Sequence, residues 1–434
     1  MSQGPTNFLS PKPSPPSPPP PSPPPSLYVP PHLRTTQPIK TAESPYKDEN
    51  AVSFQENIRY PEEDKLKKDP KKPPVLKSPL LLMVINREKK VPPGVLKMLR
   101  SASKGLVKGN KPIPTSEGNG GSYYMKDESG KKTVGIFKPT DEEPNAVNNP
   151  RGNLDVEIKR GIIVGNGASR ESATYILDHP VRGPRGDTDT TLGFSGVPLT
   201  IMVWCTDETF SHSKGFEGGT QSGKLGSLQM FMENCGSCAD LGTGIIKEFP
   251  IEEVHKIAVL DLRIGNVDRH AGNILRKYED GRVKLIPIDH AYTCPHSFED
   301  FTFEWLYWPQ AKEPFSKETF AYIKSLDAET DLAILRSNGW ELLDQSIRTL
   351  HILTSLLKYG AARELTPYDL GHILCRETDN KESMIEKIIG KADNMTPLVV
   401  GETKFLKTVL DLVHAEVDNV ANKKKSIELF GVCT

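Results

Sequence analysis

The sequence predicts an α+β fold of two lobes, preceded by a proline-rich tail. Three observations support this prediction. Residues from about 91 to 234 hold short runs of alternating β-forming residues separated by glycine-rich turns, which is typical of antiparallel strands. A helical pattern, a polar loop and an apolar strand follow over residues 250–289, and the pattern after residue 310 is mostly helical. We therefore expect a small β-rich lobe with one helix, joined to a larger lobe that is mostly helical.

The first 78 residues are predicted to be disordered. Residues 11–31 are almost all Pro and Ser, a composition that favours extended polyproline II and cannot build a core. Such a segment can dock into an aromatic-lined groove of a partner protein, and a solvated linker without a dedicated partner is an equal interpretation. The remaining boundaries give a folded domain at 79–395 (small lobe about 91–234, large lobe about 235–395) and a C-terminal helical extension at 396–434.

Two strands of the small lobe are predicted to approach phosphate groups. A turn that contains Gly120, Gly121 and Ser122 precedes the first strand, and a glycine-lined hairpin lets backbone N–H groups come close to phosphate oxygens. The second strand, residues 133–138, ends at Lys138. A lysine in this context is suited to contact the α- and β-phosphates of ATP.

Lys138 also needs a carboxylate that holds its ammonium group in place. Glu171 is our first choice, because it lies on a short predicted helix that starts near Ser169 and ends before Pro180. Glu157 is the alternative.

The most informative stretch is Asp-Arg-His-Ala-Gly-Asn, which begins at Asp268 and ends at Asn273, with Asp289 following at the end of an apolar strand. This is the order of parts in a kinase active site: the first Asp receives or orients the substrate hydroxyl, and the Asn and the later Asp hold the Mg²⁺ ions that bridge the ATP phosphates. Mn²⁺ is the alternative metal. In ordinary protein kinases the His precedes the first Asp, and Phe-Gly follows the second. Here His270 and His290 stand after them, which indicates a bilobal protein-kinase-like fold of another branch, with ATP between the lobes.

Longer motifs extend beyond these charged residues. They are Phe-Lys-Pro at 137–139, Asp-Glu-Glu-Pro at 141–144, Asn-Asn-Pro-Arg-Gly at 148–152, Gly-Ser-Leu-Gln-Met-Phe at 226–231, residues 267–275, residues 285–290, Phe-Glu-Trp-Leu-Tyr-Trp-Pro at 303–309 and Cys-Arg-Glu-Thr at 375–378. Together they resemble the phosphatidylinositol 3-/4-kinase superfamily (PI3/PI4-kinase fold). The similarity is greatest to its type II-like group and, within that, to the plant phosphatidylinositol 4-kinase gamma proteins, and it covers about residues 91–390.

The resemblance implies a phosphatidylinositol 4-kinase that uses Mg-ATP, with a role for each matching position. Lys138 would bind the ATP phosphates and Asp268 would be the catalytic Asp. His270 would shape the loop or stabilise the transferred charge, while Arg269 is interpreted as structural. The remaining positions would form an adenine-binding hinge (Gln229, Met230 and Phe231) and hold the metal ions (Asn273 and Asp289). The chain departs from the family pattern at Ala291, where a Gly is expected, and at Gly265, where an Ala is expected.

The segment after the second Asp bears on the substrate. Residues 290–304 contain no Lys or Arg, which argues against an inositol head that already carries several phosphates. The segment permits phosphatidylinositol, and equally a protein serine or threonine. Its aromatic residues could enter a bilayer interface or, as we prefer, pack inside the large lobe; they are Phe301, Phe303, Trp305, Tyr307 and Trp308. Three hypotheses follow: a phosphatidylinositol 4-kinase, a protein serine/threonine kinase, and a nucleotide-binding scaffold without catalysis.

Composition excludes several other classes. A net charge of −1 gives no global field for nucleic acid. The sequence shows no secretory signal and no apolar run of membrane-spanning length, so we expect a cytoplasmic or nuclear chain that meets a membrane peripherally. Basic runs at 65–72 and 423–425 either steer the chain to anionic lipid or are solvated surface. Cys235 and Cys238 lack a second pair at zinc spacing, so we predict no zinc site there.

Overall fold

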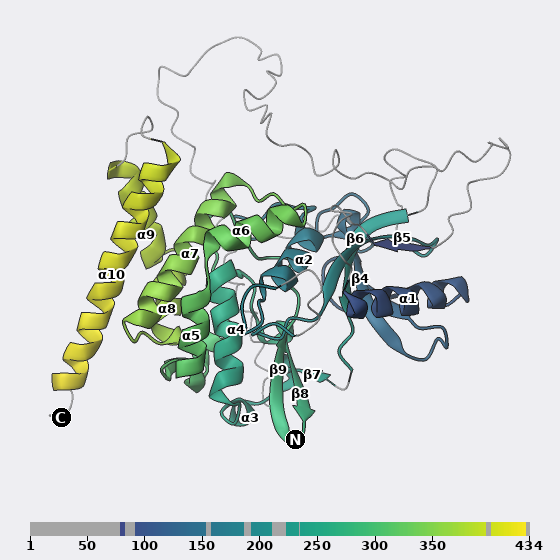
Figure 1. Cartoon of the computed structure of the whole chain (residues 1–434), viewed down its shortest axis with the longest axis horizontal. Coiled ribbons are helices and arrows are strands. Elements are labelled where there is room, and N and C mark those ends of the chain that lie inside the picture. The colour runs from purple at the N-terminus through teal and green to yellow at the C-terminus, as the bar shows by residue number, and fades with distance from the viewer. Residues whose placement is uncertain are drawn as a thin grey trace, which may run out of the picture. The chain divides into compact units, whose positions relative to one another are not determined.

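The computed structural model describes residues 79–82, 92–152, 158–185, 192–210, 223–233, 235–395 and 401–430. The described residues all belong to one compact unit, whose elements are shown in Figure 1. The predicted disordered tail of residues 1–78 and the alternative carboxylate Glu157 lie outside the described residues.

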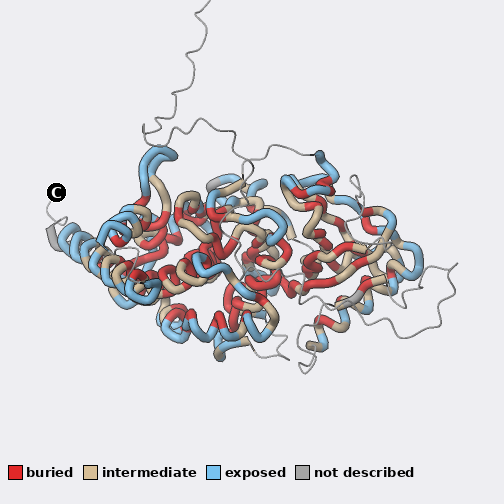
Figure 2. The backbone as a smooth tube through the Cα atoms, turned by 90° about the horizontal axis from the view of Figure 1, so that it is seen from above, coloured by how far each residue is buried: buried red, intermediate tan, exposed pale blue. Residues whose placement is uncertain are grey.

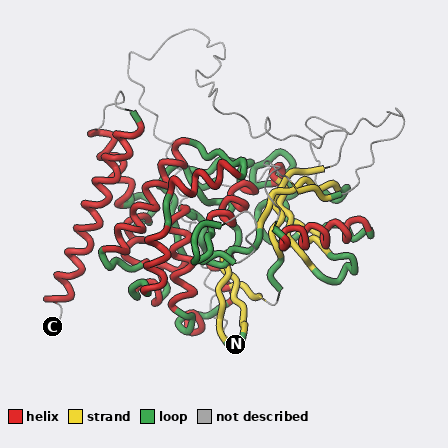
Figure 3. The backbone as a smooth tube through the Cα atoms, viewed as in Figure 1, coloured by secondary structure: helices red, strands yellow, loops and turns green. Residues whose placement is uncertain are grey.

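A six-stranded antiparallel sheet forms the core of the small lobe, in the order β1-β5-β6-β4-β3-β2. Figure 3 shows its strands gathered apart from most of the helices. Helix α1 (Pro93–Val107) packs against β1, β3 and β4, and helix α2 (Gly167–Leu177) packs against β5 and β6. The strands are β1 (Leu80–Leu82), β2 (Ile113–Pro114), β3 (Tyr123–Lys126), β4 (Thr133–Pro139), β5 (Thr200–Thr206) and β6 (Gly223–Met230).

The described residues of the small lobe form two α-helices where one was predicted, so that prediction is wrong. Helix α1 buries Val95, Met98 and Ala102, which follow the spacing of one helical face. It begins with Pro93 at its first position and makes no side-chain capping bond with the described residues. The stripe also includes Gly105, whose missing Cβ would lie 2.0 Å from the Lys126 carbonyl oxygen. Small residues at half of the contact positions weakened the hydrophobic pattern on which the prediction depended.

The large lobe joins a three-stranded antiparallel sheet to a group of helices. The sheet has the order β7-β8-β9, with β7 at Cys235–Ser237, β8 at Ile274–Glu279 and β9 at Arg282–Pro287. Helix α4 (Ile251–Ile264) contacts β9, α5, α7 and α8. The other helices are α3 (Thr243–Ile246), α5 (Lys317–Ser325), α6 (Ala328–Ser337), α7 (Asp344–Ala362), α8 (Pro367–Leu374), α9 (Met384–Met395) and α10 (Glu402–Phe430). The structure thus confirms the predicted α+β fold of two lobes.

One hydrophobic core runs through the large lobe, and Figure 2 shows its buried backbone continuing into the C-terminal helices. Helix α10 packs on α7 and α9, and it contributes Val409, Val413 and Val417 to this core. The aromatic residues after the second Asp join it as well: Phe301, Phe303, Trp305 and Trp308 are buried, whereas Tyr307 is 81% exposed. Packing was therefore the correct interpretation for four of these five aromatic residues.

Candidate active site

Three elements bring three charged side chains together where the two lobes meet. Lys138 comes from β4, Glu171 from α2, and Asp289 from the segment just after β9. The Lys138 Nζ atom lies 2.5 Å from Glu171 Oε1 and 3.2 Å from Asp289 Oδ1. Residues separated by as many as 151 positions along the chain thus meet at one ammonium group.

The neighbouring charges change the pKa values of Lys138 and Glu171 more than burial does. Burial alone would lower the pKa of Lys138, but the carboxylates of Asp289 and Glu171 raise it above its usual value. Burial alone would raise the pKa of Glu171, but the charge of Lys138 and the contact with His290 bring it far below its usual value. Lys138 is therefore a cation and Glu171 an anion at neutral pH, as phosphate binding and lysine positioning require.

The second carboxylate oxygen of Glu171 meets two further side chains. Gln229 Nε2 donates to Glu171 Oε2 at 3.3 Å and to Thr200 Oγ1 at 3.0 Å. His290 Nδ1 lies 3.6 Å from Glu171 Oε2. Burial lowers the pKa of His290, although Glu171 opposes this effect, so the imidazole is neutral at physiological pH. His290 fills the position after Asp289 with a buried ring.

The predicted hinge residues are already engaged in the sheet. The backbone N–H of Met230 donates to the Leu199 carbonyl at 2.8 Å, and that of Phe231 donates to the Val134 carbonyl at 3.2 Å. The Gln229 side chain is turned to Glu171, as described above. These two N–H groups and this amide already donate hydrogen bonds within the protein. Adenine would therefore have to contact other atoms of residues 229–231.

The predicted glycine turn is held by the acidic motif at 141–144. The Gly121 N–H donates to the Glu142 carbonyl at 2.8 Å, and a Cβ on Gly121 would lie 2.1 Å from Glu142 Oε2. Glu142 is fully buried, and its carboxylate meets Lys224 Nζ at 2.9 Å and Tyr123 Oη at 2.6 Å. This close approach to Glu142 requires glycine at position 121, independently of any role of Gly121 in phosphate binding.

Gly120 and Ser122 are fixed in the same way. A Cβ on Gly120 would lie 3.1 Å from the Glu142 carbonyl oxygen, and the Ser122 carbonyl accepts from the Thr115 N–H at 2.8 Å. Tyr123 pairs with Phe137 across the sheet, so Ser122 lies beside the position of β4 that carries Lys138. Sequence reasoning missed Glu142 and Lys224. The signal for Glu142 was the Asp-Glu-Glu motif, which was noted without a role, whereas Lys224 lies outside the motifs that were singled out.

The loop that carries Asp268 begins where α4 ends. Gly265 takes a left-handed conformation with φ of +65°, and a Cβ there would lie 2.8 Å from Leu353 Cδ1. This explains why glycine replaces the alanine that the resemblance led us to expect. Asn266 Oδ1 then accepts from the Asp268 N–H at 2.9 Å. Burial raises the pKa of Asp268 and the Asp289 carboxylate adds to this, whereas His270 opposes it.

His270 lies beside Asp268 at the surface. The Gly272 N–H donates to His270 Nδ1 at 3.1 Å, so the neutral ring carries its proton on Nε2. That nitrogen lies 4.0 Å from Asp268 Oδ2, and the His270 side chain is 57% exposed. His270 thus borders the space in front of Asp268.

Arg269 ties this loop to the segment that carries Asp289. Its side chain is fully buried, with Nε at 2.9 Å from Asp261 Oδ2. Its Nη1 donates to the carbonyls of Asn273 at 2.6 Å and Ile288 at 2.8 Å. Trp305 Nε1 donates to the same Asp261 carboxylate at 3.0 Å. One buried guanidinium therefore sets the spacing of the two predicted metal ligands, and it occupies the structural place predicted for Arg269.

The predicted metal ligands present oxygen atoms. Asn273 Nδ2 donates to the Asp268 carbonyl at 3.0 Å, which leaves Asn273 Oδ1 as the atom that can coordinate a cation. Asp289 has a φ of +54°, and its side chain is 44% exposed. Among the described residues no group of three or more His, Cys, Asp or Glu side chains is arranged around a cation position. A carboxylate and an amide suit Mg²⁺ or Mn²⁺ whose other ligands are phosphate oxygens and water.

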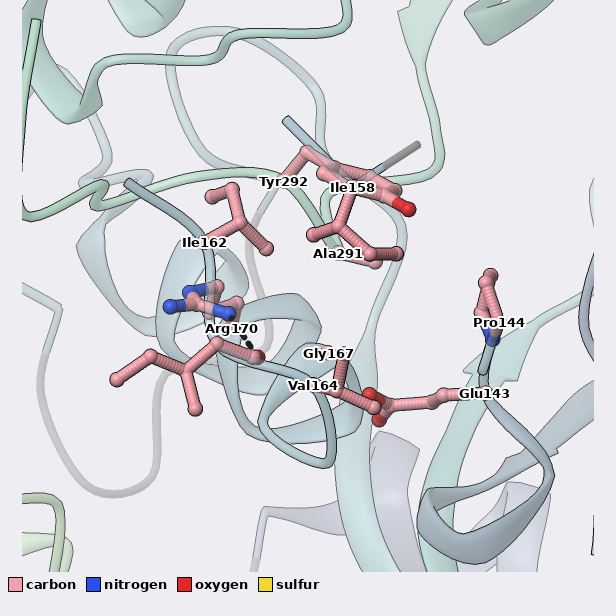
Figure 4. Close-up of a pocket in the computed structure, with 10 residues that line it drawn as sticks. Glu143, Pro144, Ile158, Ile162, Val164, Gly167, Arg170, Ala291 and Tyr292 are labelled. Carbon is pink, nitrogen blue, oxygen red and sulfur yellow. Dashed lines mark hydrogen bonds between the residues drawn. The ribbon is translucent and has the colours of Figure 1, made fainter. Parts of the chain in front are cut away.

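A pocket opens beside this site (Figure 4). Its empty volume, including the open space at its mouth, is about 280 Å³. Figure 4 shows Ile162 and Arg170 on one side, Ile158, Ala291 and Tyr292 on another, and Val164, Gly167 and Glu143 on a third, with Pro144 next to Glu143. Arg170 is 7% exposed, and its Nη1 donates to the Ile163 carbonyl at 3.1 Å. The pocket therefore adjoins both α2 and the segment that follows Asp289.

Comparison with known proteins shows the family. The model of the family described as phosphatidylinositol 3- and 4-kinase matches residues 118–370, which include Lys138, Glu171, Asp268 and Asp289. The chain belongs to this family. The resemblance that the sequence motifs carry is thereby confirmed.

Curated relatives within this family are similar over most of the chain. Phosphatidylinositol 4-kinase gamma 3 of Arabidopsis thaliana is 50% identical over 344 residues, which are 78% of this chain and 59% of that protein. Phosphatidylinositol 4-kinase gamma 4 of Oryza sativa subsp. japonica is 50% identical over 354 residues, which are 80% of this chain and 60% of that protein. The chain thus spans about 60% of the length of these plant relatives.

A solved structure, the Helicobacter pylori proinflammatory kinase CtkA, aligns with 60% of this chain and 94% of its own at 11% identity. Its TM-score of 0.29 is too low to carry an argument. In the part of this family member that the structure describes, no helix has the length and apolar character that crossing a bilayer requires.

Proposed function

We propose that this chain is an ATP-dependent phosphatidylinositol 4-kinase, which transfers the γ-phosphate of Mg-ATP to the inositol ring of phosphatidylinositol. The observation that carries the proposal is the meeting of Lys138, Glu171 and Asp289 beside the Asp268 loop, in a chain about 50% identical to proteins named as such kinases. The lipid and the position of its hydroxyl come from the names of these relatives.

Each residue has a defined part in the transfer. Lys138, held by Glu171, would neutralise the α- and β-phosphates of ATP. Asp268 would accept the proton of the inositol hydroxyl group. As it does so, the inositol oxygen would bond to the γ-phosphorus of ATP, and the bond between that phosphorus and the β–γ bridging oxygen would break. Asn273 and Asp289 would hold the Mg²⁺ or Mn²⁺ ion, which supplies charge neutralisation along the phosphates when it is bound. Gly120, Gly121 and Ser122 would cover the phosphates, and residues 229–231 would border adenine.

His270 has a more limited part. Its exposed Nε2, 4.0 Å from Asp268 Oδ2, can stabilise the phosphate as it is transferred. Because the substrate is a membrane lipid, we propose that the enzyme works in the cytoplasm at a membrane surface. The proline-rich tail would then serve either as a tether or as a docking segment for a partner protein.

Phosphate transfer from labelled ATP tests this proposal. The full chain would be offered phosphatidylinositol vesicles and a generic protein acceptor side by side, with Mg²⁺. We expect labelled lipid, and we expect Asp268→Ala and Asp289→Ala each to reduce the rate about 100-fold or more, because the transfer then loses its base or its metal ligand. Chelation of the metal should abolish transfer, and added Mg²⁺ should restore it.

A matched control is Asp240→Ala, because Asp240 is an exposed carboxylate outside the cluster. It should retain the full rate. Labelled protein without labelled lipid would show a protein kinase instead. No transfer to either acceptor, with ATP still bound, would leave a nucleotide-binding scaffold.

A further inference from the structure

The pocket of Figure 4 shares a wall with the candidate catalytic loop. The Tyr292 carbonyl accepts from the Val267 N–H at 3.0 Å, and Val267 precedes Asp268 directly. Burial and the charges of Asp268 and Asp289 raise the pKa of Tyr292 to about 12. A molecule that reaches from this pocket can therefore present a hydroxyl group to Asp268.

The walls of the pocket are almost entirely apolar. Apolar side chains supply most of the lining: Pro144, Ile158, Ile162, Ile163, Val164, Ala291 and Tyr292. Gly167 and two charged residues, Glu143 and Arg170, complete it, and these two are engaged with backbone groups of Gly165, Ala168 and Ile163. Ile163 and Val164 are each 39% exposed although they are large and apolar. Exposed apolar residues that surround a pocket, rather than being scattered singly, mark a surface that contacts another apolar body.

Cations stand beside this apolar surface. Lys159 follows the lining residue Ile158, and it makes no ion pair with any of the described residues. Its backbone carbonyl accepts from the N–H of the lining residue Ile162 at 3.2 Å, so Lys159 lies at the edge of the pocket. Arg160 is instead engaged, because its backbone N–H and its Nη2 donate to Asp300 at 2.6 and 2.7 Å. Lys159 is thus a cation beside the pocket that forms no ion pair within the described part of the chain.

The wall that carries Ile163 is already fixed in place. Arg170 Nη1 holds the Ile163 carbonyl, and the Gly161 carbonyl accepts from the His296 N–H at 2.9 Å. Together with the Arg160–Asp300 contacts, these bonds join residues 158–163 to the segment that follows Asp289. The pocket is therefore formed before any ligand enters, which lowers the cost of binding.

We propose that this pocket receives the glycerol and phosphodiester part of phosphatidylinositol, with Lys159 paired to the phosphodiester and with Ile163 and Val164 touching the apolar layer of the membrane. The proposal rests on the proposed lipid kinase function. It also supplies the cation that residues 290–304 lack. Lys159 provides one cation for the single phosphate of this lipid, while the other cation of the pocket, Arg170, is engaged with the Ile163 carbonyl.

The chemistry of the walls favours a lipid over a peptide. A peptide would bring backbone N–H and C=O groups into the pocket, and these groups need hydrogen-bond partners that apolar walls do not supply. A phospholipid combines an apolar body with one negative charge, which is the combination that the pocket and Lys159 present. On the inositol ring, position 4 also lies opposite the phosphodiester at position 1, so the reacting hydroxyl would point away from Lys159.

The test measures initial rates of the full chain against the mole fraction of phosphatidylinositol in phosphatidylcholine vesicles. The variants are Ile163→Asp, Val164→Asp and Lys159→Gln. We expect each to raise the KM for phosphatidylinositol about tenfold, because each loses one apolar or charged contact with the lipid. The kcat should stay within about twofold and the affinity for ATP should be unchanged, since none of the three touches the Lys138 cluster.

The matched controls are Val107→Asp and Lys97→Gln, which make the same changes at exposed positions of α1. Both should keep the original KM, and thermal unfolding should show every variant folded. Pocket variants with the original KM would overturn the inference while the lipid kinase function stands. A chain that labels protein, with pocket variants that raise the KM for protein, would make this a peptide site. If the unmodified chain labels no phosphatidylinositol, the proposed function itself fails, and the inference fails with it.

Discussion

Two buried charges hold the candidate catalytic loop in place. Arg269 and Asp261 are both fully buried, and their ion pair links α4, the Asp268 loop and the segment before Asp289. Such a pair adds little stability compared with apolar residues of the same size. Its value lies in geometry, because Arg269 bonds the carbonyl of the predicted metal ligand Asn273 and that of Ile288, which precedes the other ligand, Asp289.

Removing one partner of this pair should be costly. Asp261→Ala leaves the Arg269 guanidinium buried without its counter-charge, so we expect a loss of about 3–5 kcal/mol in the free energy of unfolding. Urea denaturation followed by circular dichroism would measure it. The control Asp240→Ala, at an exposed position, should change the value by less than about 0.5 kcal/mol. A loss of similar size in both variants would mean that the pair is not what stabilises the loop.

The sequence was enough to predict the role of a residue where the evidence for that role lies close to it along the chain. Asp268 and Asn273 lie in one loop, and Lys138 ends one strand, so order and context were enough to single them out. The turn of Gln229 towards Glu171 was not predictable, because it depends on how β6 packs against α2. The pairing of Glu142 with Lys224 was missed for the same reason, since the two residues lie 82 positions apart.

At the scale of an element, helix α2 is capped from outside itself. Its N-cap residue Asn166 makes no side-chain capping bond with the described residues. Glu143 instead accepts from the N–H groups of Gly165 at 2.8 Å and Ala168 at 3.0 Å. Burial raises the pKa of Glu143, although these N–H groups oppose the effect. Since Glu143 follows Lys138 by five residues, one short segment joins the lysine strand to the helix that carries Glu171.

Glu143 is therefore expected to position the Lys138–Glu171 pair. Glu143→Ala removes a helix cap, and we expect the affinity for Mg-ATP to fall about fivefold, equivalent to about 1 kcal/mol. Isothermal titration would measure it. In a Glu171→Ala background the same change should cost less than about twofold, because the pair that it positions is already lost. Asn166→Ala should leave the affinity unchanged. Equal losses from Glu143→Ala in both backgrounds would show that Glu143 acts independently of Glu171.

Helices with a clear hydrophobic periodicity were predicted well, and helices without one were not. A helix was expected to start near Ser169, another in the first part of 250–289, and mostly helices after residue 310. The structure has α2 at Gly167–Leu177, α4 at Ile251–Ile264 and, after residue 310, helices such as α7 at Asp344–Ala362. Acidic residues in the first turn of α4 gave its start. Helix α1 carries neither a cap nor a fully apolar stripe, so its burial against β3 became clear only from the fold.

Across the whole molecule, several histidines are held neutral by burial. Burial lowers the pKa of His179, His255, His290 and His414, although nearby acceptors or carboxylates oppose it in each case. They belong to four different elements or loops, so the effect is not confined to the candidate active site. In the unfolded chain each of these rings would titrate near its ordinary pKa of about 6.5.

Stability should therefore fall as the pH falls from about 7.5 to 5.5. In this range the unfolded chain takes up more protons on these histidines than the folded chain does, so the free energy of unfolding decreases with decreasing pH. Above pH 5.5 most carboxylates stay ionised in both the folded and the unfolded chain, so they contribute little to the change in stability. Scanning calorimetry across this range would follow the change in Tm. His255→Gln should make the fall smaller, because an amide can still donate to the Gln310 carbonyl, which His255 Nε2 meets at 2.8 Å, yet cannot be protonated. A Tm that stays constant or rises towards pH 5.5 would show that the folded chain binds protons on these histidines as readily as the unfolded chain does.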